Sequence, residues 1–74
     1  MSNRIDYVVD LDERGEFAAT LYNEDEIIEY FNTEDMRWLV ENYGVLHGRD
    51  RQGLMDYFLA VGLMDASDTF TILG

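Results

Sequence analysis

Apolar and polar residues alternate in two segments near the start of the chain. The first segment runs from residue 4 to 12 and the second from residue 16 to 22. An alternation with a period of two is typical of a β-strand that has one buried face. The side chains expected to face inward are Ile5, Tyr7, Val9 and Leu11 in the first segment and Phe17, Ala19 and Leu21 in the second. We therefore predict a β-hairpin with an apolar inner face.

The register of this hairpin follows from the length of its loop. A two-residue loop would pair Leu11 with Glu16, whereas a three-residue loop over residues 13–15 pairs Leu11 with Phe17. We expect the second register because it keeps the apolar residues on one face. It also places Gly15 at the last loop position, where a type I turn followed by a bulge requires a left-handed residue.

The middle of the chain shows helical spacing of its apolar residues and two helix start signals. Each signal is an asparagine followed by acidic residues, which favour the first turn of a helix. The pattern predicts helices over residues 24–31 and 34–43 and a third helix, with Gly53 in its first turn, that ends near Gly62; the start signals are at Asn23 and Asn32, and Gly44 is the stop of the second helix. Their expected inner residues are Ile27, Ile28 and Phe31, then Met36, Leu39, Val40 and Tyr43, then Leu54, Met55, Phe58 and Leu59.

The end of the chain, Thr69 to Leu73, is β-branched and aromatic and predicts a strand that joins the hairpin. Residues 1–74 are thus expected to form one α+β domain in the order ββαααβ. Its sheet would be antiparallel and three-stranded, made of the N-terminal hairpin and the C-terminal strand, with two to three short helices on one face.

Charge is the most unusual property of the chain. It contains sixteen Asp and Glu residues, five Arg and no Lys, for a net charge of -11. Such a surface repels nucleic acids and acidic membranes and attracts basic proteins. With 47% hydrophobic residues, the chain is nevertheless expected to fold. We predict a cytoplasmic protein with no targeting segment and no membrane span.

Little in the sequence points to catalysis or to a cofactor. The chain has no cysteine, which excludes disulfides and thiolate metal sites, and we expect a protein without cofactors that is not an enzyme. His47 is the single histidine, and the sequence places no cysteine or suitable serine near it that could serve as a nucleophile. The segment from Asp10 to Glu16 begins like a calcium loop, but Arg14 occupies a ligand position and Leu21 stands where a bidentate Glu is required.

Carboxylates gather in groups that suggest a binding surface. On the outer face of the hairpin, Asp12 is expected opposite Glu16, and like charges that face each other destabilise a sheet. A surface selected only for folding would usually avoid this arrangement. The residues predicted to contact a partner are Asp6, Asp10, Asp12, Glu16, Tyr22, Glu24, Asp25, Glu26 and Glu29. A rigid row of carboxylates can compete with nucleic-acid phosphates for Lys and Arg. We therefore expect a basic partner protein, one that handles nucleic acid, and no direct binding of nucleic acid.

In size and charge the chain resembles the small acidic inhibitors that phages carry against CRISPR and restriction systems. Like them, it is short, cysteine-free and acidic. This resemblance implies a non-enzymatic inhibitor that mimics DNA, with no residue roles carried over.

Two other interpretations stay open. An adaptor or antitoxin, including a homodimer, would use an apolar patch, for which Val8, Ala18, Tyr22 and Trp38 are the candidates. A protein from a high-salt cytoplasm would carry its acids only as a solvated face.

Overall fold

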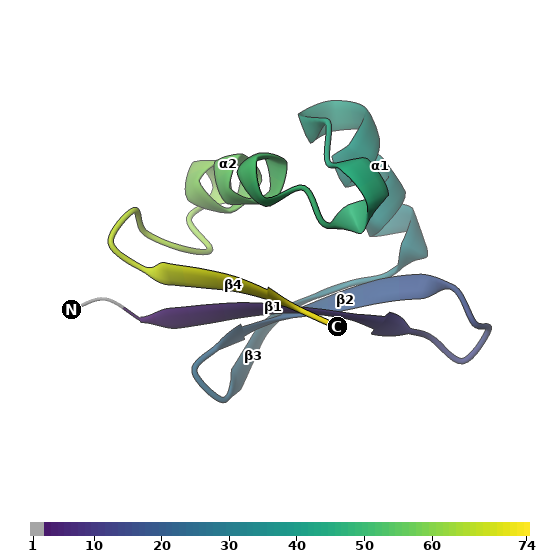
Figure 1. The fold of residues 1–74 in the computed structure, drawn as a ribbon, viewed down its shortest axis with the longest axis horizontal. Coiled ribbons are helices and arrows are strands. Elements are labelled where there is room, and N and C mark those ends of the chain that lie inside the picture. Colours follow the sequence, from purple (N-terminus) through teal and green to yellow (C-terminus); the bar gives the residue numbers. More distant parts are fainter. Residues whose placement is uncertain (1–2) are drawn as a thin grey trace.

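A computed structural model describes residues 3–74, apart from the side chain of His47, and shows one sheet with both helices on the same side (Figure 1). The candidate residue His47 therefore lies outside the described side chains. The strands are β1 (Arg4–Leu11), β2 (Phe17–Asn23), β3 (Glu26–Phe31) and β4 (Thr69–Leu73), and the helices are α1 (Thr33–Tyr43) and α2 (Arg51–Val61). A short 3-10 helix, η1 (Leu46–Gly48), lies between α1 and α2.

The sheet is mixed and has the order β3-β2-β1-β4. The α+β class, with helices on one face, is confirmed. The prediction of three antiparallel strands in the order ββαααβ is wrong, because β3 adds a fourth strand and β4 pairs with β1 in parallel. The parallel pairing arises because the two helices bring the chain back across the sheet, so that β4 starts at the same end as β1 (Figure 1).

The β1–β2 hairpin forms as the alternating pattern predicts. Leu11 pairs with Phe17 and Tyr7 with Leu21, and Gly15 has a positive φ of 76° at the end of the loop. The inner residues of the strands are buried except at the tip, where Leu11 and Phe17 are more than half exposed. The hairpin loop that follows Leu11 and precedes Phe17 projects beyond α1 in Figure 1.

The predicted first helix, over residues 24–31, is wrong, since this segment forms β3. Glu24 and Asp25 make a two-residue connection, with Asn23 paired to Glu26, and Glu24 takes a left-handed φ of 58°. The Asn23 start signal also fits a tight turn, and the isoleucines and aromatics that follow favour a strand. A segment this short gains too little from helical hydrogen bonds to resist pairing with β2.

The start signal of the second predicted helix and both glycine stops are confirmed, whereas α2 begins at Arg51 after an N-cap at Asp50 for which no signal was predicted. Asn32 and Asp35 form a reciprocal capping box at the start of α1, with Asp35 N–H donating to Asn32 Oδ1 over 2.8 Å. Gly44 and Gly62 end the two helices in left-handed conformations. On α1, Met36 and Leu39 are buried, whereas Val40 and Tyr43 of the predicted inner stripe are partly exposed.

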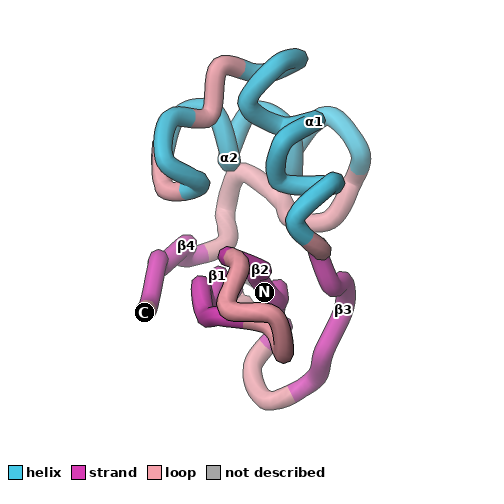
Figure 2. Tube along the Cα trace, turned by 90° about the vertical axis from the view of Figure 1, so that its right-hand side faces the viewer, coloured by secondary structure: helices cyan, strands magenta, loops and turns pink. Residues whose placement is uncertain are grey.

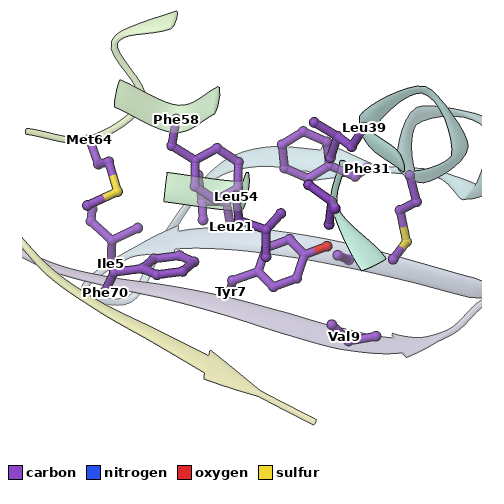
Figure 3. Packing of buried hydrophobic residues seen from close by; sticks show 13 residues of the cluster. Ile5, Tyr7, Val9, Leu21, Phe31, Leu39, Leu54, Phe58, Met64 and Phe70 are labelled. Atoms are coloured by element: carbon purple, nitrogen blue, oxygen red, sulfur yellow. The ribbon is translucent and has the colours of Figure 1, made fainter. Parts of the chain in front are cut away.

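The core lies between the sheet and the helices and is centred on Tyr7 (Figure 3). The Tyr7 ring lies 5.9 Å from the Phe58 ring and 6.4 Å from those of Phe31 and Phe70, centroid to centroid. These tilted contacts join β1, β3, β4 and α2 into one cluster. Among the described atoms, the Tyr7 hydroxyl has no hydrogen-bond partner although the side chain is fully buried.

Candidate protein-binding site

The face of the sheet opposite the helices carries no covering element (Figures 1 and 2). Because successive side chains of a strand point to opposite faces, the residues between the buried ones point to this side. We call this surface the open face, and its side chains are Arg4, Asp6, Val8 and Asp10 of β1, Ala18, Thr20 and Tyr22 of β2, Ile27 and Tyr30 of β3, and Thr69, Thr71 and Leu73 of β4. Half of them are apolar or aromatic, a large share for a sheet face that meets only water.

Two rows of side chains cross the open face from one edge to the other. The first row, across the middle of the sheet, is Tyr30, Thr20, Val8 and Leu73, and the next is Ile27, Tyr22, Asp6 and Thr71. Ile27 is 66% exposed, Tyr30 52% and Leu73 46%. Ala18, an earlier candidate for contact, is buried and so offers little to a partner. The exposed apolar side chains therefore lie at the two edges of the sheet, Ile27 and Tyr30 on β3 and Leu73 on β4.

Of the residues predicted to bind a partner, Asp6, Tyr22, Glu24 and Asp25 meet in one hollow of the open face. The hollow has a volume of about 330 Å³, and Val8, Leu73 and Arg4 complete its wall. Arg4 makes two ion pairs at this end of the sheet: its Nε lies 3.0 Å from Asp6 Oδ2, and an Nη lies 3.9 Å from Asp25 Oδ1. Three carboxylates against one guanidinium leave the hollow acidic.

Three of the other predicted acids lie away from this hollow. Asp10, Asp12 and Glu16 lie at the hairpin tip, whereas Glu24 and Asp25 of the β2–β3 connection and Glu26 at the start of β3 lie at the opposite end of the strands. At about 3.3 Å per residue, the eight residues of β1 separate these two groups by roughly 25 Å. The carboxylates thus form two groups instead of the continuous band that the sequence suggested.

Asp12 has a structural role at the hairpin tip. Its Oδ1 accepts the backbone N–H groups of Arg14 and Glu16 over 2.8 and 3.0 Å. The N–H of Glu16, followed by that of Arg14, lowers the pKa of this carboxyl below its ordinary value. Arg14 also lies 3.7 Å from Glu16, which offsets the repulsion between Asp12 and Glu16. The facing acids are therefore explained by the local structure of the loop.

A second pocket lies on the helix side of the sheet, between β3, α1 and α2. Its volume is about 220 Å³, and it is lined by the carboxylates of Glu29 and Asp35 and by the rings of Trp38 and Tyr57. The two ring centroids are 5.6 Å apart at an interplanar angle of 68°. Burial raises the pKa of Tyr57, with Glu29, Tyr43 and Asp35 adding to the effect. The sequence analysis named Glu29 and Trp38 as candidates for two different surfaces. That they line one pocket with Asp35 and Tyr57 follows only from the packing of the helices on the sheet.

A groove of about 620 Å³ runs between the hairpin tip, α1 and η1. Its apolar wall consists of Phe17, Met36 and Val40, and Arg37 and Arg49 lie beside it. The Arg49 side chain donates to the backbone carbonyl of Gly74. Two of the five arginines therefore border this groove, which sets it apart from the acidic hollow of the open face.

Within the described side chains, no group of three or more His, Cys, Asp or Glu residues could hold a metal ion. Neither helix of residues 3–74 is long and apolar enough to span a membrane. No protein-family model matches the chain, and neither a curated protein nor a solved structure shows a significant similarity to it.

Proposed function

We propose that this domain is a non-enzymatic protein that binds a basic partner protein through the open face of its sheet. The observation that carries the proposal is the composition of that face: exposed Ile27, Tyr30 and Leu73 beside a hollow lined by Asp6, Glu24 and Asp25. Specific protein interfaces combine apolar and aromatic side chains with polar ones. Here the exposed apolar side chains lie at the two edges of the sheet, with Asp6 of the hollow between them, and the acidic hollow calls for a basic complementary surface.

The exposed apolar residues of this face do not take part in the packing of the core. Ile27 and Tyr30 lie outside the core cluster, and β3 contributes Phe31 and Ile28 to that cluster instead. Aromatic and aliphatic side chains in this position serve as anchors when a partner buries them. The net charge of -11 adds long-range attraction for a basic partner and raises the rate of encounter.

A test compares two single substitutions that are matched in exposure and in charge. Ile27 on the open face is 66% exposed and Leu46 in η1 is 64% exposed, and either one changed to Arg adds one positive charge. The wild-type domain and both variants are immobilised, and bound proteins are measured from a lysate of the cells in which the protein is naturally made. We expect Ile27→Arg to lose the partner and Leu46→Arg to keep it. Equal retention by both variants would refute the proposal.

Imitation of nucleic acid, as by phage inhibitors of CRISPR and restriction systems, is the second candidate function. The excess of sixteen acids over five arginines favours it. A nucleic-acid mimic needs a row of free carboxylates. Here Val8 separates Asp6 from Asp10 on β1, and Asp12 accepts backbone N–H groups within its loop, so fewer carboxylates are free to form that row.

The second candidate predicts a different set of sensitive residues. A double variant, Asp10→Lys with Glu13→Lys, reverses charge at the hairpin tip while preserving Asp12. If the domain imitates nucleic acid through this tip, the double variant loses the partner, and duplex DNA displaces the wild-type domain from it. If the open face binds the partner, Ile27→Arg has the larger effect.

A further inference from the structure

The pocket between β3, α1 and α2 is lined by four aromatic residues and two acidic ones; the aromatic residues are Tyr30, Phe31, Trp38 and Tyr57. Trp38 of α1 and Tyr57 of α2 meet edge to face, and Tyr43 packs behind them with its ring centroid 5.0 Å from that of Tyr57. Glu29 of β3 and Asp35 of α1 line the same pocket. Aromatic faces and carboxylates both attract cations, and an aromatic pocket is the usual site for an ammonium group.

No cation from the described arginines neutralises this pocket. Arg4 and Arg14 pair with acids on the sheet and at the hairpin tip, and Arg49 and Arg51 donate to backbone carbonyls at the end of the chain. Arg37 borders other grooves. Lysine does not occur in the sequence. Burial is the main cause of the raised pKa of Tyr57, and the negative charges of Glu29 and Asp35 add to it.

We propose that this pocket binds an alkylammonium cation, either the lysine side chain of another protein or a small quaternary ammonium compound. A volume of about 220 Å³ suits one such head group and is below the range of about 300 to 1,000 Å³ typical of larger ligands. One oxygen of Asp35 already accepts the Asn32 N–H of the capping box. A compact ammonium group needs no bidentate partner, whereas a guanidinium pairs best with two free oxygens.

This site lies on the helix side of the sheet and shares one lining residue, Tyr30, with the open face. Glu29 faces the helix side of β3, opposite Leu21, and Ile27 and Leu73 of the open face do not line the pocket. A failure to bind ammonium compounds therefore leaves the proposed partner-binding function intact. Conversely, the variant Ile27→Arg tests the open face and is expected to leave ammonium binding unchanged.

The experiment titrates the domain with choline, with an N-acetylated and C-amidated lysine, and with 3,3-dimethyl-1-butanol, the uncharged analogue of choline. Trp38 is the single tryptophan, so its fluorescence reports directly on the pocket, and NMR shifts of Tyr57 provide a second readout. We expect saturable binding of a cation and binding of the uncharged analogue that is weaker by about threefold or more. Tighter binding of choline or of the lysine derivative then identifies the source of the ammonium group.

Glu29→Gln removes a carboxylate from the pocket without touching a helix cap, and Glu41→Gln is the matched control on the exposed side of α1. Glu29→Gln should weaken cation binding by about two- to fivefold, while Glu41→Gln should not change it. Spectra of both unliganded variants should match the wild type, which shows that they fold. Equal affinity for choline and its uncharged analogue, or no saturable change with either cation, would overturn the proposal.

Discussion

Leu21 and Tyr22 are neighbours on β2 but face opposite sides of the sheet. Leu21 is fully buried beneath the helices, whereas Tyr22 lies on the open face next to Ile27 and Asp6. Both faces are rich in apolar and aromatic residues, yet only the inner face is covered (Figure 2). The comparison indicates that the core is built on one face of the sheet and that the apolar side chains of the other face are left without a covering element.

The largest expected effect separates these two neighbours. Leu21→Ala removes a fully buried side chain and should lower the free energy of unfolding by about 2 to 5 kcal/mol. Tyr22→Ala removes only cross-strand contacts and should cost about 1 kcal/mol or less. Urea denaturation of both variants measures the difference. Equal losses of stability would show that the open face also supports the fold.

A second prediction concerns the helix layer that covers the inner face. A Cβ added at Gly53 of α2 would lie 2.9 Å from the backbone carbonyl oxygen of Tyr43 and 3.0 Å from Val45 Cγ2. Gly53→Ala should therefore destabilise the domain by about 1 to 3 kcal/mol, because the two helices must separate. The thermal midpoint reports the loss. A variant as stable as the wild type would contradict this close contact.

On the inner face, a substitution of Tyr7 is expected to keep or raise the stability of the domain, whereas the preceding substitutions lower it. The buried hydroxyl of Tyr7 has no partner among the described atoms, so Tyr7→Phe should leave stability unchanged or raise it by about 1 kcal/mol. Burial raises the pKa of Tyr7 to about 12, and the charge of Arg49 opposes this effect.

The same tyrosine predicts a dependence on alkaline pH. Above the ordinary value of 10.0, an unfolded Tyr7 ionises while the folded one stays neutral, so its contribution to stability is present below that pH and declines toward pH 12. Tyr7→Phe should lose less stability over this interval than the wild type. Parallel declines of the two proteins in alkaline urea titrations would contradict the assignment.

The smallest expected effect lies at the hairpin tip. Backbone N–H groups lower the pKa of Asp12, so its stabilising contribution is present above the ordinary value of 3.8 and is lost as the pH falls through the lowered value. Asp12→Asn should reduce this loss of stability on acidification. Glu13→Gln is the matched control in the same loop, since its side chain accepts neither of the two N–H groups that Asp12 holds.

The sequence predicts those parts of the fold that depend on local chemistry. The register of the hairpin follows from the alternating residues and from Gly15, and the start of α1 follows from Asn32 and Asp35. The strand β3 was missed because residues 23–26 satisfy both a helix cap and a tight turn. The left-handed conformation at Glu24, uncommon for a residue other than Gly or Asn, concealed the turn.

The candidate sites depend on contacts that no local pattern contains. The hollow of the open face requires Leu73 of β4 beside Val8 of β1, which follows only from the parallel pairing of these strands. The ammonium pocket requires Tyr57 of α2 against Trp38 of α1, which follows from helix packing. The sequence identified many of the acids and aromatics involved but not which of them would meet.

The most direct test of the central claim is hydroxyl-radical footprinting of the domain, alone and with its captured partner. The labelled side chains to compare are Ile27, Tyr30 and Leu73 on the open face with Leu46 and Val61 in the helix layer, all exposed in the free domain. We predict that the partner protects the first three and leaves the other two accessible. Protection confined to the helix layer or to the hairpin tip would contradict binding through the open face.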